Sequence, residues 1–221
     1  MINLYVNQLD MSLEINLKKH WNNAYTSKAF DKLGWFESDV SATFKLLEKS
    51  AIETTDRVLN VGAGSTTLID ELLAQGYSNV IASDLSDVSL EKLKERLGDK
   101  REEVEWIVDD LTKSTKLCEL EPVDIWIDRA VLHFFTEESD RLQYFELLKK
   151  LVKTNGYAIF AEFSLDGAVK CSGLDVHRYS NDLFKDNLGD TFELIDTFNF
   201  SYTMPSGDPR PFIYSLFKRV K

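Results

Sequence analysis

Two glycines at the end of a short apolar run have the clearest chemical meaning in this chain. The apolar residues 58–61 lead directly into Gly62, Ala63 and Gly64, and an amphipathic stretch follows from about Ser65. Glycine lets the backbone turn sharply and approach a ligand closely, and the first turn of the following helix has free N–H groups. This strand, turn and helix pattern predicts a site for a nucleotide-like ligand.

Acidic residues follow three further apolar runs. Asp84 comes after residues 79–83, Asp109 and Asp110 come after 103–108, and Asp128 comes after 123–127. Ligands of doubly wound sheets bind outside the carboxyl ends of the strands, so these acids are expected at one crevice. Carboxylates there suit a ligand that carries ribose hydroxyls, an exocyclic amine and a positive centre. S-adenosylmethionine has all three groups.

Two other nucleotide-binding patterns are disfavoured. Thr67 occupies the place where a dinucleotide fingerprint has its third glycine, which lets the helix pack closely enough to admit a pyrophosphate. The phosphate-loop pattern is also absent, because no Gly-Lys-Ser or Gly-Lys-Thr follows the turn. The glycine turn therefore argues against a nicotinamide-dependent dehydrogenase and against a nucleoside triphosphatase.

Length and composition predict one soluble globular domain, as a monomer or homodimer. The 221 residues are 43% hydrophobic and 29% charged, and the net charge of −11 disfavours nucleic acid as a partner. No leader and no membrane-spanning apolar stretch is evident, which predicts a cytoplasmic protein without membrane contact. Cys118 and Cys171 lie far apart in the sequence without metal-ligand spacing, so no disulfide is expected. The chain has three histidines, His20, His133 and His177, and no metal site is expected from them.

Alternating helices and strands predict an α/β fold with a Rossmann-like, doubly wound and mostly parallel sheet, helices on both faces and an antiparallel C-terminal hairpin. The expected helices are 12–26, 39–50, 65–75, 86–97, 137–153 and 181–187, and the expected strands are 57–61, 79–83, 103–108, 123–127, 156–163, 191–199 and 211–218. Within the single domain 1–221, we expect an N-terminal helical lid or substrate segment (1–55), a cofactor-binding core (56–163), and a substrate loop with the hairpin (164–221).

Residues 58–65, together with Asp84, Asp110 and Asp128, resemble the motifs of the class I S-adenosylmethionine-dependent methyltransferases, and the similarity spans about residues 56–163. The resemblance implies a seven-stranded sheet with an antiparallel last strand, S-adenosylmethionine as cofactor and S-adenosylhomocysteine as product. It places Gly62 and Gly64 beside the methionine part, Asp84 on the ribose, Leu85 against the adenine, Asp110 on the adenine amine, Leu111 beside the base and Asp128 near the sulfonium, and Ala63 between the two glycines is also expected to bind the cofactor. Asp110 is preferred to Asp109 because it directly precedes Leu111.

Two narrower similarities concern the substrate. Residues 128–135 and 170–180 look like segments of a group of small bacterial methyltransferases. Trp21, Tyr25 and Trp35 resemble the aromatic pattern that opens a branch including eukaryotic protein-lysine methyltransferases, and they are expected either to cover the cofactor or to pack as core aromatics. Ala24 stands where that branch often has an arginine, so carboxylate anchoring by that arginine is not implied here.

Asp128, Arg129 and His133 are expected where a substrate meets the methyl group. Methyl transfer needs mainly alignment and exclusion of water, so a general base is not obligatory. If one is used, the near-neutral ordinary pKa of histidine favours His133, with Asp128 and Tyr179 as competitors. We therefore predict an S-adenosylmethionine-dependent methyltransferase, with a small-molecule acceptor (amine, thiol or other) favoured over a protein. The alternatives are a protein-lysine N-methyltransferase and a non-catalytic S-adenosylmethionine-binding module.

Overall fold

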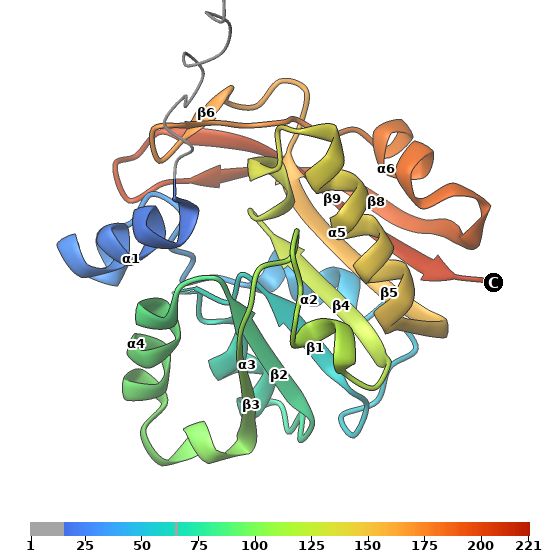
Figure 1. The fold of residues 1–221 in the computed structure, drawn as a ribbon, viewed down its shortest axis with the longest axis horizontal. Coiled ribbons are helices and arrows are strands. Elements are labelled where there is room, and N and C mark those ends of the chain that lie inside the picture. Colours follow the sequence, from blue (N-terminus) through green and yellow to red (C-terminus); the bar gives the residue numbers. More distant parts are fainter. Residues whose placement is uncertain (1–15, 65) are drawn as a thin grey trace, which may run out of the picture.

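The computed structural model describes residues 16–64 and 66–221, and its centre is a seven-stranded sheet (Figure 1). The strand order is β3-β2-β1-β4-β5-β9-β8. The strands are β1 (Val58–Val61), β2 (Val80–Asp84), β3 (Val104–Val108), β4 (Val123–Arg129), β5 (Val152–Phe163), β8 (Phe192–Thr203) and β9 (Pro209–Arg219). Strands β1 to β5 pair in parallel, whereas β9 runs antiparallel to both β5 and β8. This arrangement confirms the predicted fold class.

Two smaller features lie outside the parallel core. A short antiparallel pair, β6 (Lys170–Cys171) and β7 (Leu174–Asp175), folds the loop after β5 back on itself, and the sequence did not predict it. Strand β8 forms one edge of the sheet, and its register with β9 shifts between Leu194 and Asp196. Asp196 forms an ion pair with Lys49 at this irregularity.

Helices cover both faces of the sheet (Figure 1). The α-helices are α1 (Leu17–Ser27), α2 (Ser41–Leu47), α3 (Leu68–Ala74), α4 (Asp87–Leu97), α5 (Glu138–Leu151) and α6 (Asn181–Leu188). Short 3₁₀ turns are η1 (Phe30–Lys32), η2 (Gly98–Glu103), η3 (Leu117–Glu119), η4 (Leu132–Phe134) and η5 (Gly189–Thr191). Helices α2, α3 and α4 pack on one face, and α5 and α6 pack on the other. The predicted start of the first helix at residue 12 lies outside the described residues.

Helix α3 begins at Leu68 rather than near residue 65 as predicted. The two threonines before it make local hydrogen bonds that hold the chain outside the helix. The Thr66 hydroxyl accepts from the backbone N–H of Leu68 at 3.2 Å, and the Thr67 hydroxyl donates to the carbonyl of Glu37 at 3.2 Å. Threonine often competes with a helix in this way.

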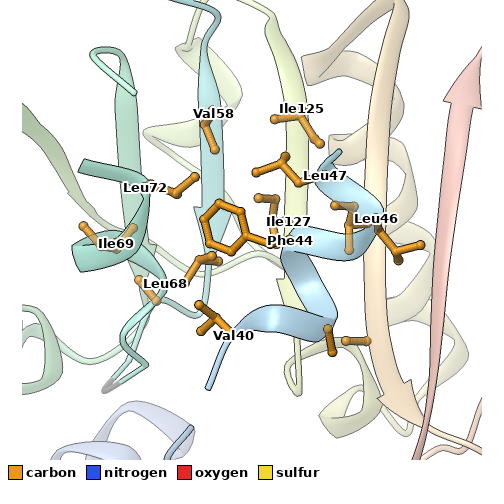
Figure 2. Packing of buried hydrophobic residues seen from close by; sticks show 14 of the residues in the cluster. Val40, Phe44, Leu46, Leu47, Val58, Leu68, Ile69, Leu72, Ile125 and Ile127 are labelled. Carbon is orange, nitrogen blue, oxygen red and sulfur yellow. The ribbon is translucent and has the colours of Figure 1, made fainter. Parts of the chain in front are cut away.

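Alternating side chains of the central strands supply both apolar layers. Ile125 and Ile127 of β4 pack on the α2 and α3 side, whereas Trp126 between them packs on the α5 side. Figure 2 shows the ring of Phe44 from α2 inserted toward β1 within the first of these layers. Because successive strand residues face opposite layers, the last two residues of β4 are also expected to face opposite sides of the sheet. This alternation determines which residues can reach a ligand.

Candidate functional site

A cavity lies at the carboxyl ends of β1 to β4. Its lining residues come from the glycine turn, the strand ends, the α1 segment and the loop after β5: Leu17, Trp21, Tyr25, Trp35, Glu37, Asn60, Gly62, Ala63, Gly64, Thr66, Leu68, Ser83, Asp84, Leu85, Asp109, Asp110, Leu111, Arg129, Ala130, Val131, Phe134, Phe135 and Cys171. The structure therefore brings together all the residues predicted for cofactor binding except Asp128. Of the three residues predicted to act on the substrate, it places only Arg129 in this wall.

Both glycines of the turn are needed for close packing as well as for backbone conformation. Their φ angles are +58° at Gly62 and +47° at Gly64, a region that residues other than glycine rarely adopt. A Cβ on Gly62 would lie 2.0 Å from Cγ2 of Val131, and one on Gly64 would lie 2.5 Å from the hydroxyl oxygen of Tyr25. The glycine turn therefore packs closely against Val131, in the connection after β4, and against Tyr25 of α1.

Asp84 is positioned by backbone donors at the end of β2. Its Oδ2 accepts from the N–H of Gly64 at 2.9 Å, and its Oδ1 accepts from the N–H of Ser86 at 2.7 Å. Burial raises the pKa of Asp84 to about 6, so the group is mainly a carboxylate at pH 7. Each carboxylate oxygen can accept more than one hydrogen bond, which leaves capacity for ribose hydroxyls.

The neighbouring acids Asp109 and Asp110 differ in how much of their hydrogen-bonding capacity the protein uses. Asp109 accepts from the Ser114 hydroxyl at 2.8 Å and from the backbone N–H groups of Lys116 and Leu117 at 3.0 and 2.9 Å. Burial opposes its ionisation, yet these donors hold the pKa of Asp109 below its usual range. Asp110 accepts from the N–H and hydroxyl of its near neighbour Thr112. Asp109 therefore organises the loop after β3, and Asp110 is the better placed acceptor for a ligand.

Aromatic residues from α1 and its following loop cover the cavity. The Trp21 ring meets Trp35 edge-on at 5.4 Å and Phe134 at 4.8 Å, and the Trp35 indole N–H donates to the Tyr25 hydroxyl at 3.1 Å. Helix α1 is fastened to α4 by Asn22, whose amide nitrogen donates to Asp87 at 2.8 Å. These contacts join the aromatic residues into a lid over the cavity, and their role in covering a cofactor stays a prediction.

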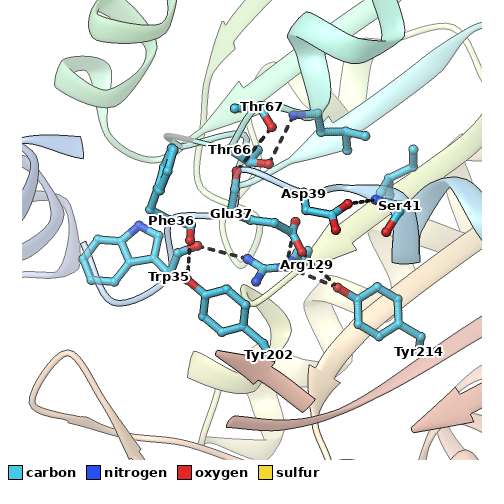
Figure 3. Close-up of polar contacts among 12 residues, drawn as sticks. Trp35, Phe36, Glu37, Asp39, Ser41, Thr66, Thr67, Arg129, Tyr202 and Tyr214 are labelled. Atoms are coloured by element: carbon cyan, nitrogen blue, oxygen red, sulfur yellow. Dashed lines mark hydrogen bonds and ion pairs between the residues drawn. The ribbon is translucent and has the colours of Figure 1, made fainter. Parts of the chain in front are cut away.

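Arg129 faces the cavity side of the sheet and makes a buried ion pair (Figure 3). Its Nε lies 3.0 Å from Glu37 Oε2, and its Nη1 donates to the carbonyl of Trp35 at 3.1 Å. The Tyr214 hydroxyl donates to Glu37 Oε1 at 3.3 Å. Burial raises the pKa of Glu37, and the Arg129 charge opposes that rise. Nη2 of Arg129 has no hydrogen-bond partner among the described residues.

Asp128 and His133 were expected to face the substrate, but neither is among the residues that line the cavity. Asp128 is fully buried on the α5 side, where it accepts from the Tyr144 hydroxyl at 2.6 Å. His133 is also fully buried, stacks on Phe163 at 4.5 Å, and has its Nδ1 2.7 Å from Glu162 Oε2. Burial lowers the pKa of His133 to about 3. A base with this pKa is a poor proton acceptor at neutral pH.

The third candidate base, Tyr179, is buried as well. Its ring stacks on Phe184 at 4.8 Å, and burial raises the pKa of its hydroxyl far above the usual range. The loop that carries it does reach the cavity through Cys171, whose pKa burial raises to about 11. The predicted substrate loop thus contributes one lining side chain, which is a neutral thiol at pH 7.

Several lining residues were not predicted: Leu17, Glu37, Asn60, Thr66, Leu68, Ser83, Ala130, Val131, Phe134, Phe135 and Cys171. Three of the lining side chains hold a buried polar atom without a partner among the described residues, namely Asn60 Oδ1, Ser83 Oγ and Arg129 Nη2. Buried polar atoms are normally hydrogen-bonded, so these atoms fit a ligand that carries both donors and acceptors. The ribose, amino and carboxylate groups of S-adenosylmethionine meet that requirement.

Within residues 16–64 and 66–221, no three histidine, cysteine or acidic side chains are arranged to hold a metal ion. The same ranges contain no helix with the length and apolar character of a membrane span.

Comparisons with known proteins bear on the class of this domain and on its fold. Residues 58–156 match a family model for a methyltransferase domain. The eEF1A lysine and N-terminal methyltransferase of Mus musculus is 24% identical over 102 residues, which are 46% of this chain and only 14% of that protein. The EEF1A lysine methyltransferase 2 of Danio rerio is 26% identical over 164 residues, with 66% of this chain and 68% of that protein covered.

Solved structures show the same fold at low sequence identity. A methyltransferase from Anabaena variabilis that depends on S-adenosylmethionine (SAM) superposes with a TM-score of 0.73 at 13% identity, and the match covers 92% of this chain and 93% of that one. The 1,6-didemethyltoxoflavin-N1-methyltransferase of Burkholderia thailandensis, solved with S-adenosylhomocysteine, gives 0.62 at 17% identity, covering 92% and 84%. The family match agrees with the predicted methyltransferase class, and the structural matches confirm the predicted fold. Residues 58–156 are thus similar to the methyltransferase-domain family, and the chain has the fold of the S-adenosylmethionine-dependent methyltransferases.

Proposed function

We propose that this protein transfers the methyl group of S-adenosylmethionine to a small-molecule nucleophile. The observation that carries the proposal is a cavity with acidic strand ends on one side and an aromatic lid on the other. Carboxylates suit the adenosine part of the cofactor, and an enclosed aromatic wall suits a compact acceptor. The cytoplasmic location, the absence of a nucleic-acid partner and the monomeric or homodimeric state stay predictions.

Each part of the cavity has a distinct task in this proposal. Asp84 accepts hydrogen bonds from the ribose and Asp110 from the adenine amine, while Gly62 and Gly64 leave room for the methionine chain. The cofactor supplies an electrophilic methyl group on a positively charged sulfur. The Trp21 ring excludes water from this group and offers a π face to the positive charge.

The acceptor attacks with a lone pair, which forms the new bond to the methyl carbon as the carbon–sulfur bond breaks. S-adenosylhomocysteine and the methylated acceptor are the products. His133, Asp128 and Tyr179 lie outside the wall, so none of these three is placed to take a proton from the acceptor. We therefore favour a nucleophile that reaches the cavity as a neutral amine or as a thiolate. A methylated amine then releases its extra proton to solvent, and a thiolate has no proton to lose.

A lysine side chain is the second candidate acceptor. It is supported by the similarity to the two lysine methyltransferases and by the net charge of −11, which would attract a basic protein. The lid argues against it, because Leu17, Trp21 and Tyr25 of α1 form part of the cavity wall, whereas a basic protein segment is expected to bind an open acidic groove. We place the small molecule first for this reason.

The test begins with isothermal titration of the protein with S-adenosylmethionine and S-adenosylhomocysteine. Micromolar or tighter binding is expected for both, and loss of binding in Asp84→Asn but not in the surface control Asp99→Asn would locate it in this cavity. The protein is then incubated with methyl-labelled cofactor and either a metabolite extract or a protein extract. Label in small metabolites supports the proposal, label in protein supports the lysine alternative, and cofactor binding without transfer to either pool supports a non-catalytic binding module.

A further inference from the structure

We infer that Arg129 binds the α-carboxylate of S-adenosylmethionine. This inference rests on the proposed cofactor site, but not on the identity of the methyl acceptor. Three independent features of the structure support it: the charge of the cavity wall, an unpartnered guanidinium nitrogen, and the register of β1 with β4.

The first feature is the charge of the wall. Among the described residues that line the cavity, Arg129 is the single cation, whereas Glu37, Asp84, Asp109 and Asp110 are acids. A carboxylate on the ligand is repelled by ionised acids and is attracted by Arg129 alone. The α-carboxylate is the one anionic group of S-adenosylmethionine, so its most favourable position in this cavity is beside Arg129.

The second feature is the unpartnered donor of Arg129. The side chain is 8% exposed, and two of its nitrogens are engaged, Nε with Glu37 at 3.0 Å and Nη1 with the Trp35 carbonyl at 3.1 Å. Nη2 is buried and has no partner among the described residues. A buried guanidinium N–H without an acceptor is costly, and a carboxylate makes the strongest kind of hydrogen bond with it. A ligand carboxylate would therefore complete the hydrogen bonding of Arg129.

The third feature is the register between the strands. Val61 pairs with Asp128, so Gly62 and Arg129 follow at the same level of the adjacent strands β1 and β4. Alternation along β4 directs Asp128 to the α5 side and Arg129 to the cavity side. The methionine part of the cofactor is assigned beside Gly62 and Gly64, which places its carboxylate at the strand end that carries Arg129.

Glu37 acts in this arrangement as a positioning residue. It lies between Arg129 and the Tyr214 hydroxyl, and the rings of Tyr202 and Phe212 lie 4.9 and 5.3 Å from the guanidinium carbon. These contacts fix the plane of the guanidinium before a ligand arrives. Fixing it in advance reduces the ordering cost of binding.

The inference is tested by comparing two ligands that differ in the amino-acid part. S-adenosylhomocysteine carries the carboxylate, and 5′-methylthioadenosine lacks the whole amino-acid end. Isothermal titration with both ligands is made on the full chain and on Arg129→Gln. Because Arg129→Gln leaves Glu37 buried without its partner, Glu37→Gln/Arg129→Gln is measured as well. The exposed pair Arg101 and Glu102, substituted in the same way, is the matched control.

We expect both Arg129 variants to lose at least about tenfold in affinity for S-adenosylhomocysteine, which corresponds to one charge-assisted hydrogen bond. Their affinity for 5′-methylthioadenosine should stay within about twofold of the unsubstituted chain, as should the control's affinity for both ligands. Unchanged binding of S-adenosylhomocysteine, or an equal loss for both ligands, would overturn the role of Arg129. If the unsubstituted chain binds neither ligand, the proposed cofactor site itself fails.

Discussion

Replacing Glu162 by glutamine should raise the free energy of unfolding above that of the unsubstituted chain, and the difference should grow as the pH rises from 5 to 8. Glu162 is fully buried, and burial raises its pKa from 4.5 to about 8. A raised folded-state pKa means that the protonated form stabilises the fold. That contribution is complete below pH 4.5 and is lost as the pH rises through about 8.

The size of the effect follows from the two pKa values. Between pH 4.5 and 8 the unfolded chain has released the proton and the folded chain still holds it, so the free energy of unfolding falls by about 1.4 kcal/mol per pH unit. Over the whole window the loss is roughly 5 kcal/mol, which is an upper bound because Asp128 titrates together with Glu162. Glutamine mimics the protonated acid. Its side-chain oxygen can still accept from the backbone N–H of His133, which lies 3.2 Å from Glu162 Oε2 in the unsubstituted chain.

The assay is urea unfolding followed by tryptophan fluorescence at pH 5, 6, 7 and 8, for the unsubstituted chain, Glu162→Gln and Glu146→Gln. Glu146 lies on the exposed side of α5, so its variant controls for the loss of a negative charge. We expect the stability difference between Glu162→Gln and the unsubstituted chain to grow in favour of glutamine as the pH rises, while Glu146→Gln shows no such trend. A difference that is constant from pH 5 to 8 would refute the reasoning.

Two further predictions concern the cofactor site. The Asp84 pKa of about 6 predicts that S-adenosylhomocysteine binds more weakly below pH 6, where the carboxylate is protonated. At pH 7, Asp84→Asn should bind S-adenosylhomocysteine about 1–3 kcal/mol more weakly, with little dependence on pH. Titration calorimetry from pH 5 to 8 measures both effects. Gly64→Ala should lower stability by about 1–2 kcal/mol through its positive φ and also weaken cofactor binding, because its Cβ would displace Tyr25. Gly76→Ala is the matched control, since its φ is +86° and no atom lies within 4 Å of its Cβ; equal binding losses in the two variants would contradict the assigned clash.

The fold could be predicted from the sequence because buried parallel strands appear as short apolar runs. Four of these runs, those of β1 to β4, end at a glycine or an acid, so the positions of Gly62, Asp84 and Asp110 near the strand ends followed directly. Helix boundaries were less accurate where local hydrogen bonds compete with the helix. Thr66 and Thr67 delay the start of α3 in this way.

The substrate end of the site could not be predicted as well, because it depends on contacts between distant segments. Glu37 and Arg129 are far apart in the chain, and no local pattern indicates that they form an ion pair. The turn η4 buries His133 and leaves its neighbour Phe134 in the cavity wall. The types of these two residues do not indicate which of them is buried. The opposite directions of Asp128 and Arg129, by contrast, follow from strand alternation and could have been expected.

The irregular edge of the sheet at β8 limits how copies of this chain can associate. A regular edge strand presents unpaired backbone groups on which another chain can add a strand. In β8 the shift between Leu194 and Asp196 breaks the even spacing of those groups, and the ion pair of Asp196 with Lys49 places charged side chains beside the break. Continuation of the sheet from one copy into the next is therefore disfavoured along β8, which protects a long strand of this protein against edge-to-edge aggregation.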